Sequence, residues 1–162
     1  MHTLLLVLLL ATPQVAQPPQ HPCRAAAYRQ FDFWIGEWDV QIQGKKIATS
    51  SIQLILDGCV IFENYEDGTG YAGKSLTAWD AGEQRWEQHY TDTMGASRYF
   101  LGTFEDGKLV MRSEFDRQGK HVMSRMTYSK EGPDRVRQSI ETSVDGGKTW
   151  TAGFNGLYVR RR

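Results

Sequence analysis

Residues 106–119 read DGKLVMRSEFDRQG. In the middle of this stretch the apolar residues Leu109, Met111 and Phe115 all fall on every second position, so they lie on one face of an extended chain. Such alternation is typical of a β-strand that buries one face. Asp106-Gly107 and Gln118-Gly119 bound the strand at either side and favour tight turns. The stretch therefore predicts one strand held between two hairpin connections.

The same unit repeats along the chain at steps of roughly 11 to 14 residues, the length of one strand and one tight connection. The turn signals lie at Gly44, Asp57-Gly58, Asp67-Gly68, Asp80-Ala81-Gly82, Met94-Gly95, Asp106-Gly107, Gln118-Gly119, Gly132-Pro133 and Asp145-Gly146-Gly147. Nine such turns join ten strands, and no interval has room for a crossover helix, so neighbouring strands are antiparallel. We expect an all-β, ten-stranded, up-and-down barrel, because closure removes the exposed edges.

Some of the alternating strands place polar residues on an otherwise apolar face. These residues are Gln88, Ser113 and Gln138. A filled core excludes such groups unless they are hydrogen-bonded, whereas a ligand cavity accommodates them. The pattern favours a barrel with a cavity over a barrel with a solid interior.

Composition narrows the classes of partner. The chain has 162 residues, which suits one domain, with 19 basic and 19 acidic residues. Balanced charge gives no reason to expect a nucleic acid or an anionic membrane as the partner. After the N-terminus, no apolar run is long enough to span a bilayer.

The N-terminus has the pattern of a secretory signal over residues 1–16. Leu4 to Ala11 is an apolar run of signal length, too short for a membrane span. The alternatives are a mis-set start codon or a buried N-terminal strand. Residues 17–23 are expected to be a flexible leader, and 24–162 a single barrel domain that begins with a short helix within Arg24–Phe33. We therefore expect an exported protein, either periplasmic or secreted.

Two cysteines, Cys23 and Cys59, remain in the exported chain. An even count in an exported protein predicts one disulfide, here between the N-terminal arm and the start of the third strand. Two free buried thiols are the alternative. No metal site is expected, because no histidines cluster with the cysteines.

The segment Phe31-Asp32-Phe33-Trp34-Ile35-Gly36-Glu37-Trp38-Asp39-Val40 resembles a family of exported bacterial proteins of unknown function with a calycin-like, ten-stranded barrel. Gly36-Glu37-Trp38 is similar to the Gly-x-Trp of lipocalin-type barrels. That resemblance implies that Trp38 packs beneath the N-terminal helix and closes the bottom of the barrel. A more distant similarity is to the nitrobindin-like haem barrels, which share the architecture.

Residues 143–150, SVDGGKTW, match the Asp-box of sialidase propellers. One copy in a chain of this length carries no sialidase meaning. We expect a structural hairpin, in which Ser143 and Asp145 bond turn amides and Trp150 covers the turn.

The candidate ligand-binding residues are ionisable or aromatic groups near the middle of predicted strands: Trp38, Glu63, Tyr65, His89, Arg98 and Arg125. If they point inward, the charged members grip a ligand carboxylate or act as an acid–base pair. The alternative is a set of cross-strand ion pairs on the outer surface. His89 and His121 are also the two histidines that could ligate haem iron, although no cofactor is expected.

Three functions remain open. The first is interior binding of a small apolar or amphipathic molecule. The second is an enzyme, an isomerase, cyclase or hydrolase, acting on a small hydrophobic substrate in the same cavity. The third is a structural or partner-binding envelope protein with a filled core and an apolar outer patch. The sequence contains no nucleophile motif that decides between them.

Overall fold

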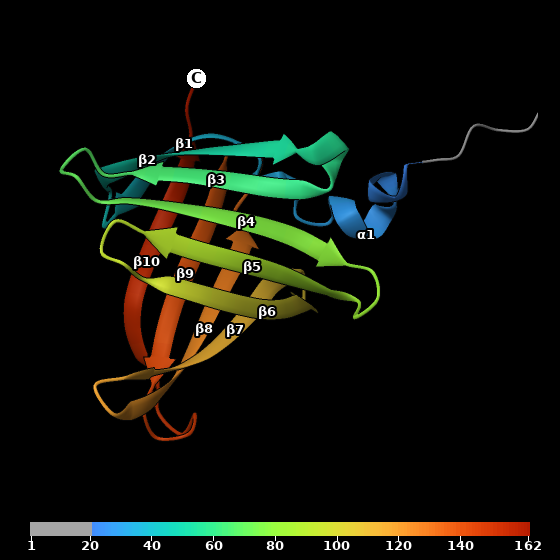
Figure 1. Ribbon diagram of the computed structural model, residues 1–162. Coiled ribbons are helices and arrows are strands. Elements are labelled where there is room, and N and C mark those ends of the chain that lie inside the picture. Colours follow the sequence, from blue (N-terminus) through green and yellow to red (C-terminus); the bar gives the residue numbers. More distant parts are fainter. Residues whose placement is uncertain (1–20) are drawn as a thin grey trace, which may run out of the picture.

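A computed structural model describes residues 21–162 (Figure 1). The expected signal, 1–16, and most of the leader lie outside these residues. A short helix, α1, spans Ala26–Arg29, and 3-10 turns occupy Pro22–Arg24, Asp32–Trp34 and Leu56–Gly58. The strands are β1 (Gly36–Ile42), β2 (Lys45–Ile55), β3 (Val60–Glu66), β4 (Ala72–Asp80), β5 (Arg85–Asp92), β6 (Ser97–Glu105), β7 (Lys108–Arg117), β8 (Lys120–Lys130), β9 (Arg135–Ser143) and β10 (Thr151–Arg160).

The ten described strands form a closed antiparallel barrel, which confirms the predicted fold. Every strand pairs with its neighbours in sequence, and β1 completes the ring by pairing with β10, for example Trp38 opposite Arg160. Each of the nine predicted turns joins two consecutive strands. Closure leaves no unpaired sheet edge within the described chain.

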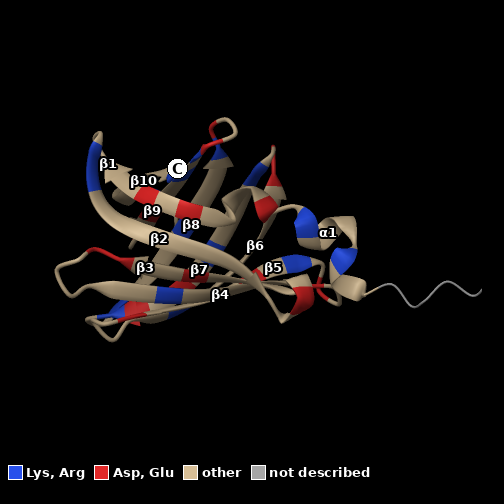
Figure 2. Cartoon of the chain, turned by 90° about the horizontal axis from the view of Figure 1, so that it is seen from above, with Lys and Arg blue, Asp and Glu red and all other residues tan. Residues whose placement is uncertain are grey.

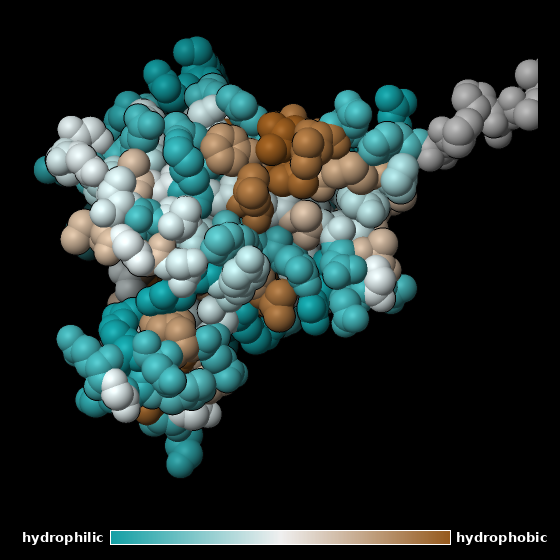
Figure 3. Space-filling view, viewed as in Figure 1, coloured by the Kyte–Doolittle hydropathy of each residue, from teal (hydrophilic) through white to brown (hydrophobic). Residues whose placement is uncertain are grey.

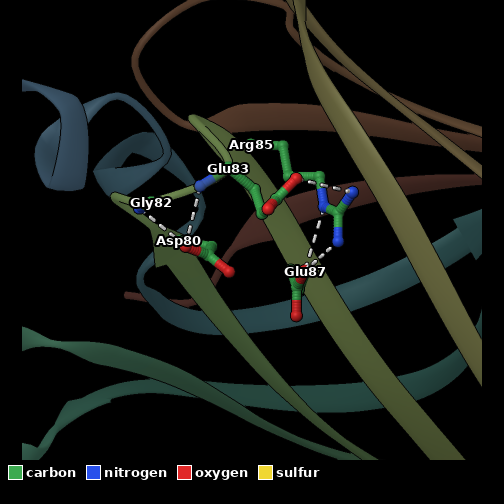
Figure 4. A network of polar contacts seen from close by, with 5 residues as sticks. All are labelled: Asp80, Gly82, Glu83, Arg85 and Glu87. Carbon is green, nitrogen blue, oxygen red and sulfur yellow. Dashed lines mark hydrogen bonds and ion pairs between the residues drawn. The ribbon is translucent and has the colours of Figure 1, made fainter.

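The β4–β5 connection shows how a turn signal becomes a turn (Figure 4). Asp80 Oδ1 accepts hydrogen bonds from the backbone amides of Gly82 at 2.8 Å and Glu83 at 3.0 Å. Arg85 then donates from Nε and Nη2 to Glu87 Oε1, at 2.9 and 2.8 Å, on the outer surface. An aspartate that ends a strand thus holds the amides of the residues that reverse the chain.

The N-terminal segment seals one end of the barrel. Phe31 stacks on Trp34 with ring centroids 4.9 Å apart, and both rings contact Tyr128. Trp38 is fully buried and donates from Nε1 to the Trp34 carbonyl at 2.8 Å. The Gly-x-Trp resemblance implied that Trp38 packs beneath the N-terminal helix; in the structure it bonds to the 3-10 turn Asp32–Trp34, which follows that helix. Phe31, Trp34 and Trp38 together form an aromatic plug, called the plug.

The short N-terminal helix predicted within Arg24–Phe33 is confirmed. Within Arg24–Phe33, only Ala26–Arg29 is α-helical, and a 3-10 turn follows at Asp32. The last residues of the expected leader, 21–23, belong to the folded unit, because Cys23 is 5% exposed and is bonded to Cys59. The predicted disulfide is confirmed, with a Cα–Cα distance of 4.9 Å.

The outer surface mixes both signs of charge. Figure 2 shows basic and acidic residues interspersed along the strands, in agreement with the balanced composition. No helix among residues 21–162 is long and apolar enough to cross a membrane.

Gly102 on β6 marks a close approach between strands. A Cβ atom there would lie 2.6 Å from the backbone Cα of Met111. We expect Gly102→Ala to lower the free energy of unfolding by about 2 kcal/mol, because backbone cannot move aside as a side chain can. Chemical denaturation followed by tryptophan fluorescence measures this change. Gly153→Ala is the control: its nearest contact would be 3.4 Å, and a loss equal to that of Gly102→Ala would refute the steric argument.

Candidate ligand-binding cavity

The barrel contains a cavity of about 410 Å³ between the plug and the opposite end. This volume is in the range of small-molecule sites. Its lining residues are Ile42, Ile47, Glu63, Tyr65, Tyr71, Gln88, Tyr90, Ala96, Arg98, Phe100, Phe115, Arg117, Ser124, Met126, Gln138, Ile140, Thr142, Phe154 and Tyr158. Because Ile42, Ala96 and Arg117 are at or beside strand ends away from the plug, the cavity opens at that end. In Figure 3 the surface is hollowed above the projecting tips of the lower strands.

Along each strand, the inward-facing residues near the plug belong to the core, and those farther from the plug line the cavity. On β3, Ile61 is buried against the plug side, Glu63 is the first lining residue, and Tyr65 follows towards the mouth. On β5 the order is the same: Trp86 belongs to the core, whereas Gln88 lines the cavity. Glu63, Gln88, Gln138 and Tyr158 therefore form the inner end of the cavity, here called the floor.

The floor is polar, whereas the wall above it is mostly apolar. The apolar wall residues are Ile42, Ile47, Phe100, Met126, Ile140 and Phe154. Such a wall stabilises a nonpolar body by burying its surface, at roughly 25 cal/mol per Å². A polar floor below an apolar wall suits a ligand with a polar end and a hydrophobic body.

Glu63 is the central group of the floor and is 4% exposed. Its Oε1 accepts from Ser50 Oγ at 3.0 Å and from the Tyr158 hydroxyl at 3.2 Å, and its Oε2 accepts from Ser75 Oγ at 3.2 Å. No lysine, arginine or histidine among residues 21–162 forms an ion pair with it. Glu63 is thus a buried acid whose partners are all neutral hydroxyls.

The hydrogen bonds continue across the floor through Tyr158 and Gln138. The Tyr158 hydroxyl lies 2.7 Å from Gln138 Oε1, and Gln138 Nε2 donates to the Tyr128 hydroxyl at 2.9 Å. Tyr158 has a single hydroxyl proton for two acceptors, Glu63 and Gln138. When Glu63 is ionised, one of them lacks its donor; when Glu63 is protonated, its own O–H donates to Tyr158 and both bonds are made.

Burial raises the pKa of Glu63 from its ordinary value of 4.5 to about 7, and the hydrogen bonds from Ser50, Ser75 and Tyr158 offset part of that rise. The neighbouring phenol of Tyr65 has its pKa raised to about 12, mainly by burial and then by nearby acidic groups. Glu63 is therefore the group in the cavity that changes its charge near neutral pH.

Tyrosines form one side of the cavity above the floor. The hydroxyls of Tyr71 and Tyr90 are hydrogen-bonded to each other and lie 3.1 and 3.2 Å from Asp92 Oδ2, so one phenol donates to the other and the second donates to the carboxylate. Gly73 makes room for this arrangement, because a Cβ atom there would lie 2.6 Å from the Tyr90 hydroxyl. The tyrosine side is thus fixed by a carboxylate that also holds the β5–β6 turn through the amides of Met94 and Ala96.

Two arginines stand at the mouth. The Arg98 guanidinium lies 3.9 Å from the centre of the Phe115 ring, and that of Arg117 lies 5.3 Å from it. Neither arginine forms an ion pair with a carboxylate among residues 21–162. Glu63, Ser75, Tyr90 and Arg98 are successive partners across three strand pairs, so the backbones of Glu63 and Arg98 are about 14 Å apart around the wall.

The structure brings together three of the six residues that the sequence nominated. Glu63, Tyr65 and Arg98 line the cavity, whereas Trp38 lies in the plug. His89 stacks on exposed Tyr99 on the outside, and Arg125 pairs with Glu141 at 2.7 Å on the outside. These outward positions exclude His89 and Arg125 from the cavity. His121 is also outside, beside Glu114 and Asp116, so neither histidine named for haem reaches the interior.

Sequence reasoning missed the floor residue Tyr158 and the mouth residue Arg117. Tyr158 lies 95 positions from its partner Glu63, and they meet only because β10 closes the ring. Arg117 extends the inward series Leu109, Met111, Ser113, Phe115 by one step, and this signal was available in the sequence.

No protein-family model matches this chain, and no curated protein matches it either. The cavity's geometry and chemistry are therefore the basis for the functional proposal.

Proposed function

We propose that this protein is an exported barrel that binds a small amphipathic molecule in its interior cavity. The observation that carries the proposal is a cavity of about 410 Å³ with an apolar wall and a buried acid, Glu63, at its floor. Ionisable groups buried in an apolar cavity are costly to the fold and are concentrated at functional sites. We also propose that the barrel is of the calycin type, on the strength of the Gly36-Glu37-Trp38 resemblance.

Export is part of the proposal, and the disulfide supports it. Cys23 and Cys59 are bonded, and disulfides persist in oxidising compartments. The apolar run Leu4 to Ala11 provides the signal that this location requires.

The two other functions have weaker support. The acid–base pair that the sequence suggested joins Glu63 to His89, and His89 lies on the outer face. A filled structural barrel is at odds with the cavity. Figure 3 does show apolar side chains on the outside. Leu54 and Leu56 are among the exposed large hydrophobic residues, at 37% and 70%, but an apolar outer surface does not account for the cavity.

Filling the cavity tests the proposal. Ile140 on β9 lines it, so Ile140→Trp is expected to weaken binding of the fluorescent probe anilinonaphthalene sulfonate at least about tenfold, since the indole occupies the probe's space. The measurement is a fluorescence titration of the mature, oxidised protein. Leu101→Trp places the same indole on the outer face, where Leu101 is 39% exposed, and should bind like the wild type. Equal binding by all three proteins would refute an interior site.

A further inference from the structure

The ligand's polar end can be inferred from the floor. We propose that Glu63 receives a basic nitrogen, so that the bound molecule is an amine whose apolar body lies along the wall. This inference rests on the proposed function, because it assigns chemistry to the same cavity.

The first argument is charge. Glu63 is 4% exposed and has three hydroxyl neighbours but no cation. A buried carboxylate normally has a cationic partner, and removing such a partner from a buried pair is strongly unfavourable. When Glu63 is ionised the described chain supplies no such partner, and the ligand is then the source of the missing positive charge.

The second argument is the orientation of the donors. Ser50 and Ser75 donate to the two oxygens of Glu63 from either side, on β2 and β4. Oε1 already accepts two hydrogen bonds, whereas Oε2 accepts one and can accept another, and Glu63 is among the residues that line the cavity. An ammonium has three donors and no acceptor, so it matches a group that only accepts.

The third argument is that the other titratable groups facing Glu63 carry no charge near neutral pH. The titratable groups that face Glu63 are phenols: Tyr158 on β10, Tyr128 on β8, Tyr65 on its own strand and Tyr71 before β4. All four have raised pKa values, principally through burial, so they stay neutral. The groups of β2 and β4 that contact Glu63 are the hydroxyls of Ser50 and Ser75, which do not titrate. Both arginines stand at the mouth, and the backbone of Arg98 is about 14 Å from that of Glu63 around the wall.

The proposal has a pH signature. Because the pKa of Glu63 is raised to about 7, the acid is largely protonated at low pH and must release its proton when an ammonium binds. Amine affinity is therefore full above about pH 7 and falls roughly tenfold for each pH unit below it. A neutral ligand of the same shape shows no such dependence on Glu63.

The test compares octylamine, octanol and octanoate by titration calorimetry on the mature, oxidised protein. At about pH 8 we expect octylamine to bind at least about tenfold more tightly than octanol, and to lose roughly 100-fold in affinity between about pH 8 and about pH 5. Glu63→Gln should remove both the preference and the pH dependence while octanol binding persists, which shows that the variant is folded. Glu66→Gln, on the outer face of the same strand, should behave like the wild type.

Each other result overturns a definite claim. Equal affinities for octylamine and octanol, or a preference that survives Glu63→Gln, would overturn the amine site and leave interior binding intact. Tightest binding of octanoate would overturn it too, and would move recognition to Arg98 and Arg117. If none of the three probes binds, both the amine site and the proposed function are overturned.

Discussion

Replacing Cys23 and Cys59 together by serine is expected to lower the free energy of unfolding by about 4 kcal/mol. The bridge closes a loop with a sequence separation of 36, and the chain-entropy model gives about 4 kcal/mol for a loop of that length. The bond also anchors the segment that leads into the plug, where Arg29 donates to the Gly58 carbonyl beside Cys59. Loss of the covalent tie leaves that segment to be held by packing and by noncovalent contacts such as this hydrogen bond.

Guanidinium unfolding followed by tryptophan fluorescence measures this change. Two controls are built in. Reduction of the wild type should produce the same loss, and the intact mass of the oxidised wild type should be lower than that of its reduced form by two hydrogens. A double variant within about 1 kcal/mol of the oxidised wild type would show that the bridge adds little to a plug already fixed by its aromatic contacts.

Glu63 should make the wild-type protein less stable as the pH rises. Its pKa is raised from 4.5 to about 7 by burial, so between these values the unfolded chain has lost the proton that the folded chain retains. The stabilisation from this group is present below about pH 4.5 and is lost as the pH rises through about 7, a change of about 3 kcal/mol. Glu63→Gln keeps the shape without the ionisation. Relative to wild type, it should therefore gain about 3 kcal/mol between about pH 4 and about pH 8.

The measurement is a series of denaturation curves for both proteins across that range. The difference between the two proteins isolates Glu63, because all other titrating groups are shared. Glu66→Gln, an exposed position on the same strand, should follow the wild type at every pH. A wild type and Glu63→Gln whose stabilities stay parallel would show that Glu63 ionises as easily in the fold as in the unfolded chain.

The strands could be predicted because their signals are local. A turn such as Asp106-Gly107 and the alternation after it lie within a dozen residues, and together they fix where the chain reverses. The short helix could be predicted for the same reason, because Ala25 to Ala27 favour helix locally and Ala26–Arg29 is helical. The residues Phe31 and Trp34 that follow it are held by aromatic contacts inside the barrel.

The cavity was predicted only in part, because its lining depends on which alternate residues of each strand point into the barrel. On β8 the inward series Val122, Ser124, Met126 places Arg125 outside. On β6 the sequence is ambiguous: Arg98 and Phe100 face inward, but Tyr99 and Leu101 would make an equally apolar face. β10 contains a register shift between Ala152 and Phe154, so the inward position of Tyr158 could not be obtained by counting from the turn.

The pairing of β1 with β10 has a consequence for how this protein matures. Trp38 and Arg160 are neighbours in the sheet although they are separated by nearly the whole described chain. Contacts of such long sequence separation slow folding, because a large loop must be closed before they form. A chain that emerges N-terminus first exposes β1 with one edge unpaired until its final strand arrives. The ring, and the cavity inside it, can form only after synthesis of the described strands is almost complete, so a product truncated before β10 has neither a finished barrel nor the cavity.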